Sequence, residues 1–199
     1  MMRLIGITGG IGSGKSVVSQ VLASLGYKVY NCDKEAKRIM DMSETVKKQL
    51  SDRISADVID DSGCIRRSLL SEIVFSDKEK LLILNDIVHA SVREDVQQWL
   101  MELSRNNCKT AFIESAILFA SHLDEDVDAV WKVTAPLNLR ISRVMSRDGL
   151  SRDHILRRIE SQQKEERSTH HHQSEIVNDE RQSLLLQIDE LLASLSEQQ

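Results

Sequence analysis

Proline, cysteine and long apolar runs are scarce in this chain of 199 residues, and each scarcity excludes a class of protein. Pro136 is the single proline, which is typical of a chain dominated by helices and strands. Cys32, Cys64 and Cys108 are odd in number and widely scattered, so they indicate reduced thiols and not a disulfide framework. No apolar run reaches the length of a membrane span and no signal peptide opens the chain, so we expect a cytoplasmic protein without membrane contact.

The sequence also lacks an excess of positive charge. Lys and Arg number 26 against 31 Asp and Glu, which gives a formal net charge of −5 at pH 7. A dedicated nucleic-acid binder needs a positive field to neutralise phosphates, so nucleic acid is not an expected partner. Hydrophobic residues make up 41% of the chain, which is enough for a core. The length fits one α/β domain, and we expect a monomer, with an oligomer as the alternative.

The apolar pattern predicts strands that alternate with helices. Strands are expected over 3–8, 27–31, 110–114, 129–134 and 176–177. Helices are expected over 17–25, 34–57, 67–104 with a break at an Asp77 cap, 136–147, 151–167 and 180–195. This alternation is typical of a doubly wound parallel sheet in the α/β class.

The helical stretch before residue 105 is longer than one crossover between strands requires. We therefore predict a single domain over 1–199 with a core over about 1–58, 106–138 and 168–199. A helical insertion over about 59–105 is expected to build the second-substrate site, and a helical lid is expected over about 139–167.

Residues 9–16 match the phosphate-binding pattern G-x-x-x-x-G-K-[ST], between a predicted strand and a predicted helix. The glycines allow the backbone N–H groups to point inward at phosphate, and the helix adds the positive end of its dipole. Lys15 supplies a cation for the β- and γ-phosphates, and the Ser16 hydroxyl is a ligand for Mg²⁺. The alternative is a glycine-rich turn that caps an ordinary helix. The expected ATP contacts of this segment are Gly10, Ile11, Gly12, Ser13, Gly14, Lys15, Ser16 and Val17.

Positive charge is concentrated in residues 140–167 of a chain that is acidic overall. Arginines in a lid stabilise the charge of a migrating phosphoryl group and exclude water. Arg143 and Arg147 are the favoured pair, because four residues separate them and they share a helical face. The alternative is a solvated face with local ion pairs, since acidic residues are interspersed.

Two carboxylates follow predicted strands. Asp33 is the candidate general base, because a kinase needs a carboxylate beside the phosphate loop to accept the proton of the attacking hydroxyl. Its alternative role is the N-cap of a helix that begins at Lys34. Glu114 ends an apolar strand, where it either holds Mg²⁺ through water or is a polar strand terminus. His89 is expected to pack within a helix, and residues 170–172, all histidine, receive no metal role.

The chain resembles bacterial dephospho-coenzyme A kinases over nearly its whole length. Residues 5–16 are close to the family's opening block, and Asp33 is followed by its Ala-Lys-Arg segment. Residues 67–77 and 84–89 are similar to the family's R..L...VF.D and LN.I.H segments. Residues 143–151 resemble its R...RDGLS lid, and residues 176–179 resemble its I.N block.

The resemblance implies phosphorylation of the ribose 3′-hydroxyl of dephospho-coenzyme A by ATP, the last step of coenzyme A synthesis. Asp33 would be the base, Lys15, Arg143 and Arg147 would also be catalytic, and Asn178 and Arg143 would contact ATP. The acceptor would be bound by Asp33, Arg67, His89 and Glu114. The cofactors implied are ATP and Mg²⁺.

Some positions depart from the family pattern. Ala90 stands where the family has proline, and Ala116 and Ala120 replace a proline and an acidic residue of the D.PLLFE block. Ser121 or Glu125 are the nearby polar residues that would compensate. We expect these changes to affect acceptor affinity more than ATP binding.

Parts of the sequence are also compatible with other functions. Another nucleoside- or nucleotide-type kinase would share the core, and an inactive nucleotide-binding homologue would share the loop. A GTPase-like switch is disfavoured, because Asp60-x-x-Gly63 lacks a preceding buried strand and no N-K-x-D motif is present.

Overall fold

The computed structural model describes residues 2–162 and 167–197 of the chain. It divides into two compact units, which are described separately. The first, called here the sheet unit, comprises residues 1–31 and 107–199. The second, called the helical unit, comprises residues 32–106.

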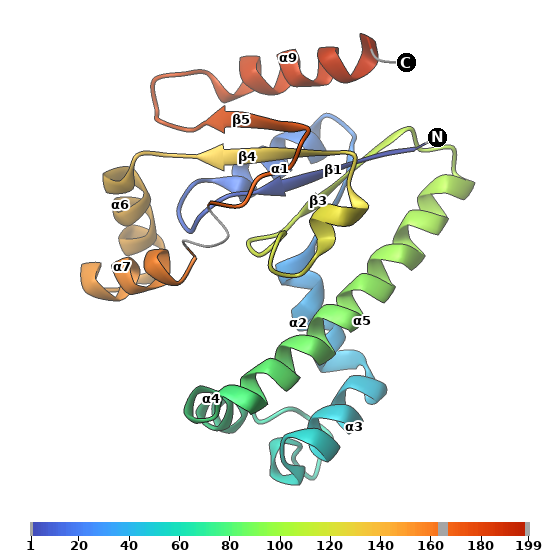
Figure 1. Cartoon of the computed structure of the whole chain (residues 1–199), viewed down its shortest axis with the longest axis vertical. Helices are drawn as coiled ribbons and strands as arrows, with labels where there is room; N and C mark the ends of the chain where they lie inside the picture. Colours follow the sequence, from blue (N-terminus) through green and yellow to red (C-terminus); the bar gives the residue numbers. More distant parts are fainter. Residues whose placement is uncertain (1, 163–166, 198–199) are drawn as a thin grey trace. The chain divides into compact units, whose positions relative to one another are not determined.

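The sheet unit is built on five parallel strands: β1 (Arg3–Thr8), β2 (Lys28–Asn31), β3 (Thr110–Glu114), β4 (Ala129–Thr134) and β5 (Gln173–Val177). Their order across the sheet is β2-β3-β1-β4-β5, and every neighbouring pair is parallel. All five strands therefore point their carboxyl ends toward one edge, where the loop after β1 begins (Figure 1). The predicted parallel α/β fold is confirmed.

One face of the sheet carries the main core, under α1 (Lys15–Ser24) and α9 (Leu184–Glu197). Ile5 and Ile7 of β1 point into it and are fully buried, beside Phe112 and Trp131, whose ring centroids are 5.2 Å apart. Each such side chain contributes about 1.5–3 kcal/mol by leaving water. On the other face a Cβ at Gly6 would lie 2.7 Å from Leu118 Cδ2, so that side chain packs directly on β1.

The predicted lid is a helix pair in the sheet unit, α6 (Leu137–Asp148) and α7 (Arg152–Ser161). Gly149 ends α6 with φ 66°, and the Ser151 hydroxyl caps α7 by accepting a bond from His154 N at 3.4 Å. Ile141, Val144, Ile155 and Ile159 form a small core between the two helices. The pair lies at the edge toward which β4 points (Figure 1). The expected helix 151–167 ends at Ser161, and its residues 163–166 lie outside the described part.

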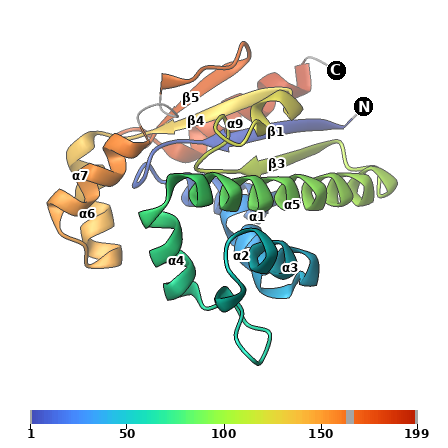
Figure 2. The ribbon, with the colours of Figure 1, turned by 60° about the horizontal axis from the view of Figure 1, so that its bottom comes forward.

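The helical unit consists of α2 (Cys32–Met42), α3 (Glu44–Arg53), a short 3₁₀ turn η1 (Ala56–Val58), α4 (Arg67–Ser76) and α5 (Lys78–Arg105). Figure 2 shows α2, α3 and α4 gathered along the long α5, and each of them contacts it. The insertion was expected to begin near residue 59. The compact unit instead begins at Cys32, because α2 and α3 pack on α5.

Two further predicted helices differ from the structure. The single helix expected over 34–57 is wrong, because Ser43 has an extended backbone and accepts a bond from Val46 N at 3.3 Å, which starts α3 anew. The last helix begins at Leu184 and not at residue 180, because Glu180 has a φ of 65° that a right-handed helix does not allow. Among the described helices, none is long and apolar enough to cross a membrane.

The predicted Asp77 cap is confirmed and gives a stability test. Asp77 Oδ1 accepts bonds from Glu79 N at 2.9 Å and Lys80 N at 3.3 Å at the start of α5. We expect Asp77→Ala to lower the free energy of unfolding by about 1 kcal/mol, measured by urea denaturation. Asp77→Asn keeps an acceptor oxygen and serves as the matched control, with a loss well below that of alanine. Equal losses in the two variants would contradict a capping role.

Candidate active site

The loop between β1 and α1 holds glycines in conformations that side chains rarely adopt. Gly12 has φ 77°, and Gly14, the N-cap of α1, has φ 97°. A Cβ at Gly14 would lie 2.0 Å from Asn178 Nδ2, and one at Gly12 would lie 2.6 Å from the backbone oxygen of Arg140. Glycine is therefore required at both positions, by conformation and by space.

The loop presents groups suited to an anionic ligand. The amino end of α1 brings unpaired N–H groups and the positive end of the helix dipole to the loop. Lys15 Nζ donates to Gly9 O at 2.7 Å, so the cation folds back over the loop. Ser13 Oγ is buried with no hydrogen-bond partner among the described residues, whereas Ser16 and Val17 are exposed. A buried hydroxyl without a partner in the protein can bond to a ligand atom or to water, and within the described part of the chain the hydroxyls of Thr8 and Ser19 share this property.

Two arginines of α6, a helix of the predicted lid, differ in whether they contact the loop. Arg143 lies against the loop, with Nη1 donating to Gly12 O at 3.5 Å and Nη2 to Glu180 at 3.0 Å. Arg147 points instead to Asp148, with Nε and Nη2 donating at 2.7 and 2.9 Å, and its side chain is 64% exposed. The structure thus brings Arg143 to the phosphate loop and leaves Arg147 on the lid surface.

Asn178 follows β5 and binds the loop directly. Its Nδ2 donates to Ser13 O at 2.8 Å, and its backbone N donates to Thr134 O at 2.8 Å. Arg143 Nη2 donates to its backbone oxygen at 3.1 Å and to Oδ1 at 3.3 Å. Asn178 and Arg143, both predicted ATP contacts, are therefore joined to the loop and to each other, and Asn178 holds the loop through its side-chain amide.

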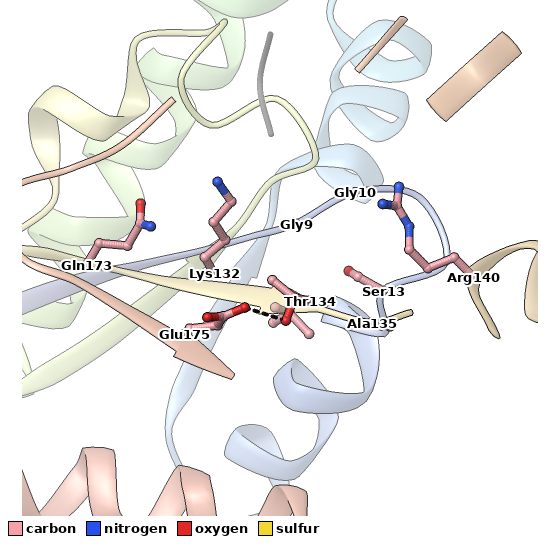
Figure 3. Close-up of a pocket in the computed structure, with 10 residues that line it drawn as sticks. Gly9, Gly10, Ser13, Lys132, Thr134, Ala135, Arg140, Gln173 and Glu175 are labelled. Carbon is pink, nitrogen blue, oxygen red and sulfur yellow. Dashed lines mark hydrogen bonds between the residues drawn. The ribbon is translucent and has the colours of Figure 1, made fainter. Parts of the chain in front are cut away.

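A pocket of about 340 Å³ lies beside the loop, and residues of β4 and β5 line it (Figure 3). Ser13 of the loop lines it, and Thr134 Oγ1 donates to Glu175 Oε1 at 2.7 Å in its floor. Its lining mixes both signs of charge, so it suits a polar group. The complete lining comprises Gly9, Gly10, Ser13, Lys132, Val133, Thr134, Ala135, Arg140, Gln173 and Glu175.

The two candidate carboxylates occupy different settings. Glu114 is buried at the end of β3, at the register position of Ile7 in β1, and accepts a bond from Asn31 Nδ2 at 2.8 Å. Asp33 is exposed in the first turn of α2, two residues beyond the end of β2. Because α2 begins at Cys32, Asp33 is not the N-cap of a helix that begins at Lys34. Its role as a base stays a prediction.

The predicted acceptor residues of the helical unit are Arg67 and His89. Arg67 is the first residue of α4, and its Nη2 donates to Asp41 Oδ1 of α2 at 2.6 Å. Both members of this pair are about half exposed, so the pair is weak and open to exchange with a ligand. His89 is half-buried within α5. Acceptor binding by either residue stays a prediction.

Charged hydrogen bonds shift pKa values near the loop. The Arg147 side chain holds the pKa of Asp148 below its ordinary value, and that contact in turn raises the pKa of Arg147. The backbone N–H groups of Gln182 and Arg181 lower the pKa of Asp179, next to Asn178. Both carboxylates are therefore ionised at neutral pH, and Asp148 reduces the net positive charge of the predicted lid.

The residues named as substitutes in the altered D.PLLFE block have local partners. Ser121 is buried, and its hydroxyl donates to Ile117 O at 2.7 Å. Glu125 is exposed and pairs with His122 Nδ1 at 3.1 Å. Ser121 therefore does not supply the missing acidic group.

This geometry can be compared with that of known proteins. The dephospho-CoA kinase family model matches residues 3–183. The chain belongs to the dephospho-CoA kinase family. It is therefore an enzyme of the kinase class, and ATP is its co-substrate.

Members of the dephospho-CoA kinase family resemble the chain over most of its length. One from Bacteroides fragilis is 38% identical over 192 residues, which is 96% of this chain and 92% of the relative. One from Porphyromonas gingivalis is 42% identical over 165 residues, which is 83% of this chain and 80% of the relative. A solved dephospho-CoA kinase from Campylobacter jejuni has a TM-score of 0.70 and 26% identity, and the match covers 99% of this chain and 98% of that one.

Family membership confirms the activity class predicted from the residues, but the sequence analysis missed residues that shape the loop. Arg140 is 9% exposed, and its Nε donates to Ile11 O at 2.9 Å. Gln162 Oε1 accepts a bond from Ile11 N at 2.8 Å. Glu180 pairs with Arg143. Arg140 lies in the basic stretch over 140–167 and Gln162 in the predicted lid over 139–167, but neither has a pattern that specifies its partner.

The close contact at Gly14 gives a test of the loop in this dephospho-CoA kinase family member. We expect Gly14→Ala to weaken ATP binding on the order of 10-fold or more, measured by titration calorimetry, because the new Cβ displaces Asn178 and moves the N–H groups. Gly26→Ala is the matched control, because Gly26 has a similar φ of 92° and nothing within 4 Å of an added Cβ. The control should lose stability and keep ATP affinity. Equal affinity losses would refute the role of the close contact.

Proposed function

We propose that this protein transfers the γ-phosphate of Mg·ATP to the ribose 3′-hydroxyl of dephospho-coenzyme A, giving coenzyme A and ADP. The observation that carries the proposal is the phosphate loop with Arg143 and Asn178 joined to it, in a chain that matches the dephospho-CoA kinase family over residues 3–183. The curated relatives bear the name of this activity. The expected rivals, another nucleotide kinase and a GTPase-like switch, have no comparable support.

Positioning and charge neutralisation do most of the work in such a transfer. Backbone N–H groups at the start of α1 bind the β- and γ-phosphates, and Lys15 neutralises them. The acceptor oxygen forms a bond to the γ-phosphorus while the bond from that phosphorus to the bridging oxygen of ADP breaks. Asp33 takes the proton of the hydroxyl, and Arg143 stabilises the charge that develops on the transferred group. Arg147 would join it only after its guanidinium leaves Asp148.

Magnesium fits the residues present. Within the described ranges, no three His, Cys, Asp or Glu side chains gather as a cage for a metal ion. Mg²⁺ needs no such cage when phosphate oxygens and water complete its shell, and the exposed Ser16 hydroxyl at the end of the loop is a suitable oxygen donor. When bound, the ion neutralises charge on the β- and γ-phosphates. Glu114 is a further candidate for contact through water.

The expected acceptor residues Arg67 and His89 belong to the helical unit, and Glu114 belongs to the sheet unit. Arg67 would exchange its exposed bond with Asp41 for a phosphate of the acceptor, since the carboxylate and the phosphate compete for the same donors. The ring nitrogens of His89 would donate or accept a hydrogen bond with the same ligand.

The direct test is a coupled assay of ADP release from Mg·ATP, with dephospho-coenzyme A as the acceptor and adenosine and water as controls. We expect turnover that depends on dephospho-coenzyme A and on Mg²⁺, and that is abolished in Lys15→Ala. ATP binding without this turnover would contradict the proposed acceptor. Retained activity in Lys15→Ala would show that the loop is not the phosphate site.

The base is tested by Asp33→Asn. We expect kcat to fall by roughly 10²-fold or more while the Kd for ATP stays within about twofold, since the carboxylate acts on the acceptor hydroxyl. Asp189→Asn, on the exposed side of α9, is the matched control with unchanged kcat. An unaltered kcat in Asp33→Asn would rule out the base assignment.

A further inference from the structure

Ile11, in the middle of the phosphate loop, is held by the lid at three points. Its N–H donates to Gln162 Oε1 at 2.8 Å, and its carbonyl accepts from Arg140 Nε at 2.9 Å. Its side chain packs on the apolar cluster between α6 and α7 that contains Ile141 and Ile155. The N–H group, the carbonyl group and the side chain of Ile11 thus all contact α6, α7 or the residue that follows α7.

Gln162 is well placed for this contact. It is the C-cap of α7, with φ −90° and ψ 0°, and its backbone N–H bonds back to Ile159 and Glu160. Its side chain therefore reaches the loop from the end of α7. Arg140 lies in the first turn of α6, and only 9% of it is exposed.

We infer that Gln162 is a positioning residue for ATP: by accepting the Ile11 N–H, it couples the lid helices to the conformation of the phosphate loop. The N–H of Ile11 is then turned away from the ligand. The N–H groups that follow, from Gly12 to Lys15, are held in the orientation that phosphate requires. The ionic contact of Arg143 depends on the same lid position, since Arg143 and Arg140 belong to one helix.

The size of the effect follows from one hydrogen bond. A neutral hydrogen bond contributes about 1 kcal/mol, which corresponds to about fivefold in an equilibrium constant. An N–H left without its acceptor adds a desolvation penalty. We therefore expect a several-fold effect on ATP affinity, with much smaller effects on the acceptor and on global stability.

The experiment compares Gln162→Met, which has a similar volume and no oxygen acceptor, with wild type. Selective ¹⁵N labelling of isoleucine follows hydrogen exchange of the Ile11 amide without any ligand. The Kd for ATP is measured by calorimetry and the KM for dephospho-coenzyme A by the coupled assay. In Gln162→Met we expect about fivefold faster exchange at Ile11, a Kd for ATP raised about three- to tenfold, and an acceptor KM within about twofold of wild type.

Two further variants distinguish a positioning role of Gln162 from a general effect on folding. Gln162→Glu keeps an acceptor oxygen, so the slow exchange of Ile11 should return. Gln20→Met makes the same chemical change on the exposed side of α1 and should match wild type in every measurement.

Two outcomes would overturn the inference. One is unchanged Ile11 exchange and ATP affinity in Gln162→Met, and the other is faster exchange throughout the sheet together with equal changes for both substrates. The kinetic measurement rests on the proposed function, whereas exchange and ATP affinity do not. If wild type fails to phosphorylate dephospho-coenzyme A, the proposed function falls, and those two measurements still decide the role of Gln162.

Discussion

The backbone conformation of residues 9–14 is the constraint on which the rest of the sheet unit depends. Positive φ angles at Gly12 and Gly14 turn the chain sharply between β1 and α1. Asn178 and Arg140 then approach so closely that a Cβ on either glycine would collide with them. Asn178 directly follows β5, and Arg140 belongs to α6, which follows β4. Both reach the loop because parallel strands end at the same edge of the sheet. The loop therefore holds its shape through contacts supplied by residues distant in sequence.

Two arginines of α6 bond to carbonyl oxygens of the loop and its surroundings. Arg140 bonds to Ile11 O, and Arg143 bonds to Gly12 O and Asn178 O. A guanidinium group offers several N–H donors in a fixed plane, so it can bond to the backbone and still present positive charge nearby. Charge fixed in this way would need little reorganisation on binding a phosphate group. Glu180 balances part of that charge by pairing with Arg143.

Local signals in the sequence predicted most elements correctly. The strands over 3–8 and 110–114 are apolar runs that the parallel sheet buries on both faces, whereas the strand over 129–134 leaves Lys132 and Thr134 partly exposed. All three occur where predicted. The caps at Asp77 and Ser151 were recognisable because a short polar side chain precedes a helical pattern. The break at Ser43 was missed, since the apolar spacing continues across it. The beginning of α9 was also missed, because the left-handed backbone of Glu180 has no sequence signature.

The phosphate loop and the family resemblance were determined by the sequence alone, because the loop's chemistry depends on glycines, a lysine and a serine at fixed local spacing. Which basic residues reach that loop was decided only by the tertiary structure. Arg143 lies on it and Arg147 does not, although both were predicted from one helical face. The rotation of α6 is set by the packing of Ile141 and Val144 against α7. The bonds from Gln162 and Asn178 to the loop join residues more than a hundred positions apart, and no local pattern encodes such contacts.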